Sequence, residues 1–326
     1  MNLHNDIFLI GNEKEFTEIA LAVFNMQADN VPVYKQFINH LHINPSRVKS
    51  IKDIPFLPIE LFKSHKIIHK DYTANLIFES SGTTGMNTSR HYVASSEIYK
   101  TSLINGFIRF YGSPDQYAIL ALLPSYLERN NSSLVYMVKY LIEKTSCNYS
   151  GFYLNEYEKL IATLYQLRNE KKKIILIGVS FALLELAEKY QPDLSGIIVM
   201  ETGGMKGKRP EITRDELHQV LKKNLNLETV HSEYGMTEIL SQAYSKEKGI
   251  YQSPPWMKIL IRDPYDPRKI LDKDASGGIN VIDLANLYSC SFLATSDLGK
   301  IIPRKGFEIS GRLSSSDIRG CNLLFA

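Results

Sequence analysis

Cysteine is scarce in this chain, and neither positive nor negative charge is in large excess. The 326 residues include three cysteines, Cys147, Cys290 and Cys321, and the formal net charge at pH 7 is only +3. An odd and low cysteine count argues against a disulfide framework and favours a reducing, cytoplasmic setting. No basic run or basic helix face stands out, so the sequence does not point to nucleic acid as a partner.

Long hydrophobic runs are missing as well. The longest is YAILALLP at 117–124, far short of the roughly 20 residues that span a bilayer. The first residues, MNLHNDIFLIGN, lack the basic start and apolar core of a secretion signal. Hydrophobic residues make up 44% and charged residues 22% of the chain, which is ordinary for an enzyme in solution. We therefore expect a soluble, cytoplasmic protein without a membrane span.

What the sequence does contain is an alternation of helical and strand-like patterns. Residues 12–28 place apolar side chains at helical spacing behind an acidic first turn, and residues 33–41 predict a second, short helix. Continuous apolar runs, typical of buried strands, occupy 117–123, 174–179 and 196–201. Helices should follow these strands, because capping signals appear at Ser132 and at Thr213 with Glu216.

This strand–loop–helix repetition predicts an α/β fold with a largely parallel sheet covered by helices. The predicted α/β core, with its helical N-terminal segment, covers residues 1–249. From residue 250 onward, short strands separated by Pro, Gly and Asp predict a small β-rich subdomain of the same unit over 250–312. A short tail over 313–326, carrying Cys321, completes the predicted organisation.

A small, polar stretch is the first candidate binding motif. It consists of Ser80, Ser81, Gly82, Thr83, Thr84 and Gly85, and Arg90 follows shortly after it. The two glycines allow positive φ, so that successive N–H groups point the same way and, with the hydroxyls, bind phosphate oxygens. The sequence is not a Walker loop, because GxxxxGK[ST] is absent. The alternative reading is a solvated polar loop.

The second candidate motif is HSEYGMTEIL at 231–240. Glu238 is a hard oxygen ligand suited to Mg²⁺ that is held together with phosphates. Tyr234 offers a flat face to a purine, and Gly235 allows a base or ribose to approach the backbone. The alternative is an ordinary strand–turn–helix junction with a solvated glutamate.

A third motif, TSDLGKI at 295–301, is followed by Gly311-Arg312. Asp297 is suited to accept hydrogen bonds from vicinal ribose hydroxyls, and Arg312 to reinforce contact with the same sugar. An isolated Asp-Leu-Gly is common in proteins, and the alternative interpretation of this motif by itself is a surface turn.

Taken in order, these motifs resemble the adenylate-forming superfamily of acyl-CoA synthetases, beetle luciferases and adenylation domains, over roughly residues 75–320. The resemblance implies the layered α/β fold of that superfamily's N-terminal domain, with ATP and Mg²⁺ as cofactors. It also implies roles for individual residues. Ser80–Gly85 would hold the β,γ-phosphates, Glu238 the Mg²⁺, Tyr234 and Gly235 the adenine, Asp297 and Arg312 the ribose, Thr202, Gly203 and Gly204 an adenine-side loop, and Thr237 the α-phosphate or acyl carboxylate.

Three further segments, LLPSYLERNNSSLVYM (122–137), ETGGMKGK (201–208) and RGCNLLFA at the end, look like the acyl-protein synthetases of bacterial luminescence. That resemblance implies ATP-dependent activation of a fatty acid, transfer to Cys321, and delivery to a protein acceptor such as a reductase. Arg319 would favour the thiolate of Cys321, the form that attacks an acyl adenylate. The alternative for Cys321 is an idle thiol, and Cys147 and Cys290 are interpreted as structural.

The chain also departs from the superfamily pattern. Only fourteen residues follow Arg312, so we expect most of the usual C-terminal domain, with its charge-neutralising lysine, to have no counterpart. Replacement cations among Lys206, Lys208, Arg304 and Lys305 are equally suitable on sequence alone. Two other functions therefore stay open. One is an acyl-adenylate ligase that delivers to coenzyme A or a carrier protein, as in phenylacetate-type ligases; the other is a nucleotide-binding subunit without catalysis.

Overall fold

The structure, a computed structural model, describes residues 2–80, 88–124, 131–204, 212–272 and 274–313. Ser81–Gly85, Lys206, Lys208 and Cys321 lie outside the described residues. The chain divides into two compact units: unit 1 contains Met1–Ser102, Thr237–Ser241 and Gln252–Ala326, and unit 2 contains Leu103–Met236 and Gln242–Tyr251. Each unit is built from several segments, and the domain boundary expected near residue 250 stays a prediction.

Unit 2 is organised around a mostly parallel sheet with the order β5-β4-β6-β7-β8-β9. Neighbours from β5 to β8 run parallel, and β9 is antiparallel at the edge. The strands are β4 (Tyr117–Leu122), β5 (Gly151–Phe152), β6 (Lys173–Val179), β7 (Ile198–Thr202), β8 (His231–Tyr234) and β9 (Ala243–Ser245); β10 (Ile250–Tyr251) ends the unit. Every residue of β4 is buried, which explains its unbroken apolar sequence.

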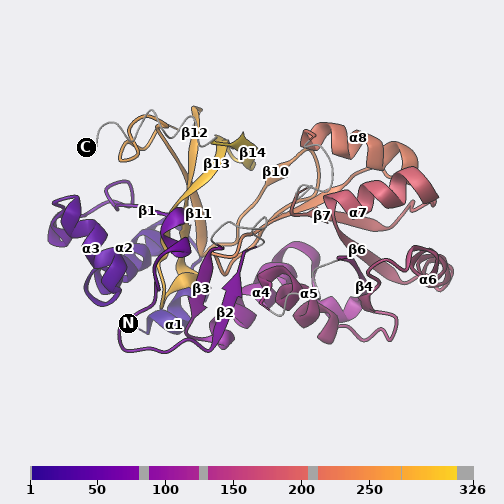
Figure 1. The fold of residues 1–326 in the computed structure, drawn as a ribbon, viewed down its shortest axis with the longest axis horizontal. Helices are drawn as coiled ribbons and strands as arrows, with labels where there is room; N and C mark the ends of the chain where they lie inside the picture. The colour runs from indigo at the N-terminus through magenta and orange to yellow at the C-terminus, as the bar shows by residue number, and fades with distance from the viewer. Residues whose placement is uncertain (1, 81–87, 125–130, 205–211, 273, 314–326) are drawn as a thin grey trace. The chain divides into compact units, whose positions relative to one another are not determined.

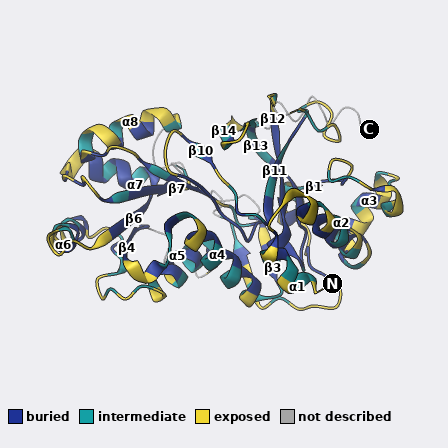
Figure 2. Cartoon of the chain, turned by 180° about the vertical axis from the view of Figure 1, so that it is seen from behind, coloured by how far each residue is buried: buried dark blue, intermediate teal, exposed yellow. Residues whose placement is uncertain are grey.

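The helices of unit 2 begin where the sequence predicts. Ser132 accepts a hydrogen bond from Val135 N, and Thr213 and Glu216 form the expected reciprocal capping box. Figures 1 and 2 show α7 and α8 beside each other on one face of the sheet and α5 on the other, with α8 alternating buried and exposed residues. The helices are α5 (Ser133–Glu143), α6 (Tyr157–Asn169), α7 (Ser180–Glu185) with a π-helical continuation (Leu186–Tyr190), α8 (Arg214–Leu225) and a 3₁₀ turn (Pro114–Gln116).

Unit 1 contains an antiparallel sheet with the order β14-β13-β12-β11, to which β1 adds in parallel beside β13. Its strands are β1 (Leu57–Pro58), β11 (Met257–Arg262), β12 (Ser276–Asp283), β13 (Phe292–Ile302) and β14 (Gly306–Arg312). The β-rich character predicted after residue 250 is thus confirmed. A separate ribbon pairs β2 (Leu76–Glu79) with β3 (Arg90–Val93) in antiparallel fashion.

Helices from the N-terminal part of the chain complete unit 1. They are α1 (Leu3–Asp6), α2 (Glu13–Asn30), α3 (Pro32–His40) and 3₁₀ turns at Ile7–Leu9, Pro45–Arg47, Ile59–Lys63 and Leu284–Asn286 (η6); α4 (Ser96–Tyr111) contains the boundary between the units. Buried Gln27 on α2 donates to the carbonyls of Asn286 and Leu287 and accepts from Ser291 N. Because a buried amide needs partners, these bonds fix α2 against the turn between β12 and β13.

The glycine of the Asp-Leu-Gly motif has a packing reason. Gly299 lies at a register shift in β13, opposite β14, and a Cβ there would collide with the backbone carbonyl of Glu308 and lie 2.8 Å from Ile279 Cδ1. By contrast, Gly106 on α4 has no heavy atom within 4 Å of a Cβ position. The first glycine is required by its surroundings, and the second is not.

We therefore expect Gly299→Ala to destabilise unit 1 by about 1–3 kcal/mol, the usual effect of overpacking. Gly106→Ala should be neutral or stabilising, because alanine is the better helix former. Thermal melts of both variants beside the parent test this expectation. A melting temperature for Gly299→Ala at or above that of the parent would contradict the packing argument.

Candidate active site

Within unit 1, the structure brings together Glu238, Asp297 and Arg312 from distant parts of the sequence. The Glu238 side chain is 6% exposed and accepts a hydrogen bond from the Ser89 hydroxyl. Burial raises the pKa of Glu238, while the Ser89 hydrogen bond and the charge of Arg312 lower it and Asp297 raises it. The expected magnesium ligand and the expected ribose-binding pair are thus close enough to act on one another electrostatically.

Asp297 and Arg312 face each other directly in the ladder between β13 and β14. Arg312 Nε donates to Asp297 Oδ1 over 3.0 Å, with the carboxylate side chain 8% and the guanidinium side chain 80% exposed. The arginine thus neutralises a nearly buried acid while keeping most of its own surface open. This arrangement leaves a charged, hydrogen-bonding edge at the place where the sequence predicts ribose.

The phosphate-loop candidate is the connection between β2 and β3. Of its predicted residues, Ser80 is described, and its Oγ accepts from Ser89 N over 2.9 Å while Ser80 N donates to the Ser89 carbonyl over 3.0 Å. Ser80 and Ser89 therefore close the base of the loop. At the same end of the ribbon, exposed Arg90 donates to Glu79 over 3.0 Å, which pairs its charge in this structure.

Thr237 belongs to unit 1, next to Glu238, whereas the predicted adenine-side residues belong to unit 2, at the carboxyl ends of β7 and β8. Thr202 donates to the buried Glu233 carboxylate over 2.6 Å, and Gly203 has a φ of 69°, which favours glycine. A Cβ at Gly235 would meet the end of the Glu233 side chain, so the carboxylate would have to shift. The Tyr234 ring lies 5.9 Å from the ring of Tyr251. Gly204 follows Gly203 in an irregular segment.

A second carboxylate, Glu201, lies beside this group on β7. It is 4% exposed and pairs with Arg214 Nε at 3.3 Å and with His218 Nε2 at 3.6 Å, both from α8. Burial raises the pKa of Glu233 to about 7. The Thr202 hydrogen bond opposes this shift, and the neighbouring Glu201 charge adds to it. Sequence reasoning missed both acids, because isolated glutamates next to hydroxyl residues carry no distinguishing pattern.

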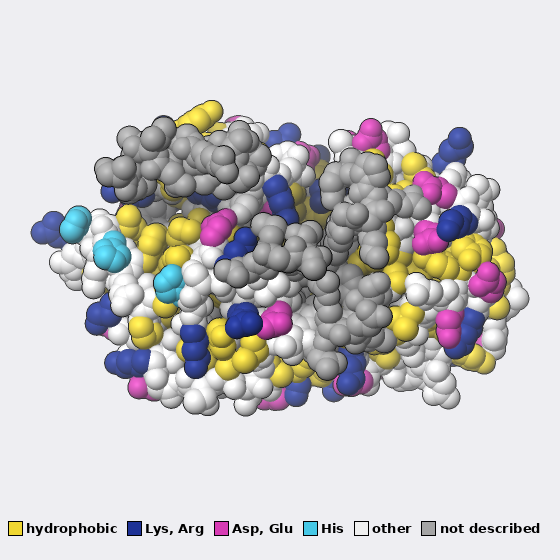
Figure 3. Space-filling model, viewed as in Figure 1, with side chains coloured by type: hydrophobic (Ala, Val, Ile, Leu, Met, Phe, Trp, Pro, Cys, Tyr) yellow, Lys and Arg dark blue, Asp and Glu magenta, His cyan; other side chains and the backbone are white. Residues whose placement is uncertain are grey.

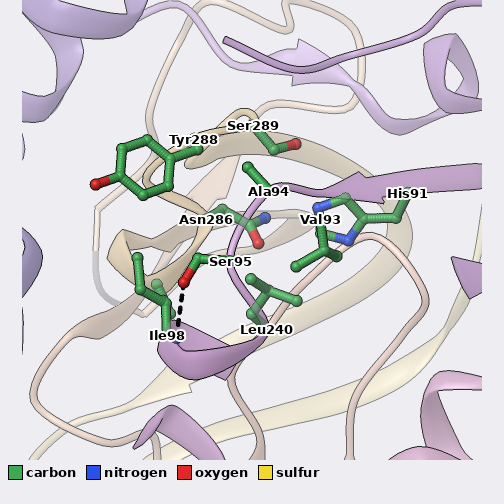
Figure 4. Close-up of a pocket in the computed structure, with 10 residues that line it drawn as sticks. His91, Val93, Ala94, Ser95, Ile98, Leu240, Asn286, Tyr288 and Ser289 are labelled. Atoms are coloured by element: carbon green, nitrogen blue, oxygen red, sulfur yellow. Dashed lines mark hydrogen bonds between the residues drawn. The ribbon is translucent and has the colours of Figure 1, made fainter. Parts of the chain in front are cut away.

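A small cavity in unit 1, of about 10 Å³, is lined by Leu240, two residues after Glu238 (Figure 4). His91 from β3 lines one side, and Asn286 and Ser289 from the turn after β12 line another. Three buried polar atoms on these residues, His91 Nε2, Asn286 Oδ1 and Ser289 Oγ, have no hydrogen-bond partner among the described residues. Asn286 and Ser289 were not singled out from the sequence, where His91 stands out only as the neighbour of Arg90 in a basic pair.

Of the described cysteines, Cys290 is unsuited to act as a thiolate nucleophile. Cys290 is completely buried, and burial raises the pKa of its thiol to about 12, which is consistent with the structural interpretation. Cys147 is half-buried and free. Cys321, the predicted nucleophile, lies outside the described residues.

The described residues also bear on metals, membranes and charge. They contain no group of three or more His, Cys, Asp or Glu side chains arranged to hold a metal ion. Within the same part of the chain, no helix combines the length and apolarity needed to cross a bilayer.

On the face shown in Figure 3, Lys and Arg side chains are interspersed with Asp and Glu, and the described residues there form no patch of one sign.

Comparison with known proteins decides the family. The model of the family described as acyl-protein synthetase, LuxE, matches residues 10–326. The chain belongs to this family. It is therefore a ligase of the acyl-protein synthetase type, as the resemblance of its motifs implied.

The chain is similar to several known proteins, each at less than 25% identity. The long-chain-fatty-acid–luciferin-component ligase of Aliivibrio fischeri is 23% identical over 321 residues, which cover 90% of this chain and 83% of the relative. Among solved structures, a 2-hydroxyisobutyryl-CoA ligase in complex with 2-HIB-AMP and CoA aligns with a TM-score of 0.68 and 12% identity, over 94% of this chain and 72% of that one.

ATP-bound MatB from Rhodopseudomonas palustris aligns with a TM-score of 0.54 and 17% identity, over 72% of this chain. The aligned region spans about half, 47%, of the MatB chain. At these identities the two structures show the fold alone, and they confirm the expected layered α/β fold of adenylate-forming ligases.

The buried Glu233 carboxylate predicts a pH dependence of stability. Its pKa is about 7 in the folded protein against an ordinary 4.5, so its contribution to stability is fully present below pH 4.5 and is lost as pH rises through 7. Between pH 5 and 8, the parent should lose about 2 kcal/mol more stability than Glu233→Gln. Urea unfolding across this range measures the difference, with exposed Glu228→Gln as the control. Parallel pH profiles for the parent and Glu233→Gln would contradict the expectation.

Proposed function

We propose that this acyl-protein synthetase activates a fatty acid with ATP and carries the acyl group on Cys321. A carboxylate oxygen attacks the α-phosphorus of ATP, giving acyl-AMP and pyrophosphate. The Cys321 thiolate then attacks the acyl carbon, and AMP leaves with the electrons of the broken anhydride bond. The thioester passes to a protein acceptor such as a reductase. A cytoplasmic, reducing setting keeps the thiol available for each cycle.

The observation that carries this proposal is the grouping of Glu238 with Asp297 and Arg312 in unit 1. These three residues belong to two motifs that lie up to about 75 residues apart in the sequence, and their electrostatic proximity supports the binding of one nucleotide between them. Family membership supports the acyl-protein outcome, and the name of the Aliivibrio fischeri relative supports a long-chain fatty acid as substrate.

The residues present suit a bound Mg²⁺. Magnesium is usually held by one or two carboxylates, while phosphate oxygens and waters complete its octahedron. Glu238 supplies one carboxylate in a nearly buried setting, next to a serine hydroxyl and near a second acid. When bound, the ion would neutralise charge on the phosphates; Thr237 would donate to the α-phosphate or the acyl carboxylate, and Arg90 would stabilise the leaving pyrophosphate.

Two substitutions separate nucleotide chemistry from nucleotide binding. Glu238→Gln should lower the kcat of acid-dependent exchange of pyrophosphate into ATP roughly 10²-fold, the loss typical for removing one electrostatic stabiliser. Asp297→Asn should chiefly raise the KM for ATP, by about tenfold, because it weakens a charged hydrogen bond. Exchange kinetics at varied ATP measure both. Full exchange in Glu238→Gln would exclude its proposed role, and acid-independent ATP binding without exchange in the parent would favour a non-catalytic subunit.

The thiol step has its own test. Incubation with ATP, Mg²⁺ and a labelled long-chain fatty acid should add one acyl group to the parent, removable by hydroxylamine and detected by intact-mass spectrometry. Cys321→Ser should lose the label, and Cys147→Ser should keep it. Equal labelling of Cys321→Ser would rule out the acyl-cysteine. Thioester formed only on added coenzyme A or carrier protein, at full rate without Cys321, would select delivery to those acceptors instead.

A further inference from the structure

The segment Thr237–Ser241 contains Thr237 and Glu238, two residues of the proposed site, and it belongs to unit 1 although its flanks belong to unit 2. Most of the segment is buried. A buried peptide must have its N–H and C=O groups satisfied by partners. Three side chains from other parts of unit 1 provide those partners.

His91 holds the first peptide group. Its ring is fully buried on β3, and Nδ1 lies 2.9 Å from the carbonyl oxygen of Thr237. Since a carbonyl only accepts, Nδ1 carries the proton. Burial lowers the pKa of His91 to about 4, so the ring is neutral near pH 7 and Nε2 is a bare acceptor.

Asn286 and Asp283 hold the rest of the segment. Asn286 Nδ2 donates to the Glu238 carbonyl over 2.8 Å. The Asp283 carboxylate accepts from Leu240 N at 2.7 Å and from Ser241 N at 3.0 Å. Each contact therefore links the segment to β3 or to the end of β12, and the two consecutive carbonyls of Thr237 and Glu238 are fixed from two separate elements.

We propose that His91 and Asn286 are positioning residues for Thr237 and Glu238, and that one water molecule joins them across the cavity. The proposal rests on the proposed function, because it assigns these residues to the orientation of the same nucleotide site. Fixing consecutive carbonyls sets the peptide plane between Thr237 and Glu238. That plane determines the direction in which the Glu238 carboxylate leaves the backbone towards Ser89 and Asp297.

The cavity supports the water. About 10 Å³ is the space that one water-sized sphere occupies. His91 Nε2 and Asn286 Oδ1 are acceptors that each need a donor, and the Ser289 hydroxyl is a donor that needs an acceptor. All three atoms lack partners among the described residues. A single water satisfies this set, because it donates two hydrogen bonds and accepts others.

Two amide substitutions at one position test the carbonyl contact. In His91→Asn, the side-chain N–H₂ occupies the place of Nδ1 and can still donate to the Thr237 carbonyl. In His91→Gln, the amide reaches the place of Nε2 and the Nδ1 contact is lost. We expect His91→Gln to lower the kcat of pyrophosphate exchange about tenfold, the effect of one lost hydrogen bond, with the KM for the carboxylic acid unchanged. His91→Asn should recover most of this loss.

The control is His69→Gln, the same chemical change at another buried histidine of unit 1, which should leave exchange unchanged. Equal loss in His91→Asn and His91→Gln would overturn the proposal, since it would mean that packing volume matters rather than the donor. A fall in melting temperature without any change in kcat would also overturn it. Asn286→Asp, which replaces the N–H₂ donor by an acceptor, should reproduce the kcat loss of His91→Gln.

A readout that does not depend on activity separates this proposal from the proposed function. Hydrogen exchange of the peptide covering 237–241, in nucleotide-free protein, should be faster in His91→Gln than in His91→Asn or the parent. This difference is expected even if no acid supports exchange of pyrophosphate, and its absence would exclude the clamp. A high-resolution crystal structure should show a water bonded to His91 Nε2 and Asn286 Oδ1; an empty cavity would remove the water from the proposal.

Discussion

The constraint on which the site depends is that Thr237–Ser241 is mostly buried without being part of any helix or strand of the described fold. A regular strand would pair its backbone groups along the ladder, but this segment cannot. Its carbonyls and amides are instead bonded by side chains of His91, Asn286 and Asp283. The peptide that carries the proposed metal ligand is thereby fixed by long-range contacts, which is how a protein holds functional side chains in an irregular region.

Burial of the acidic side chains costs free energy, which hydrogen bonds to their carboxylates offset. Burial raises the pKa of Asp283 to about 6 and that of Glu233 to about 7. In both cases, hydroxyl or amide donors act in the opposite direction and favour the ionised form. The Asp283 carboxylate accepts hydrogen bonds from several backbone amides, whereas the Glu233 carboxylate lies beside Glu201 and Thr202. A buried carboxylate thus holds backbone amides in place in unit 1, and in unit 2 a buried carboxylate has a pKa near neutral pH.

The glycines of the recognised motifs divide according to what they avoid. Gly203 has positive φ, Gly235 avoids a collision with Glu233, and Gly299 avoids one with the Glu308 carbonyl. Only the first of these is a matter of backbone conformation. At Gly235 a side chain would displace the Glu233 carboxylate, and at Gly299 it would meet the backbone of the neighbouring strand, so these two glycines carry information about packing in addition to access for a ligand.

The sequence alone determined the local elements and the chemical types at the site. Capping at Ser132 and Thr213, the buried strand β4 and the β-rich character after residue 250 are properties of short windows, which local propensity and periodicity decide. Motif order identified Glu238, Asp297 and Arg312, because their types and sequence spacing carry the resemblance to adenylate-forming ligases. Tertiary structure alone decided that these three lie together, that Ser80 and Ser89 close a loop, and that His91, Asp283 and Asn286 hold the segment Thr237–Ser241. Those contacts join residues 9 to 146 positions apart, and no window of sequence contains a signal for a hydrogen bond whose partners meet only when the sheet and ribbon have formed.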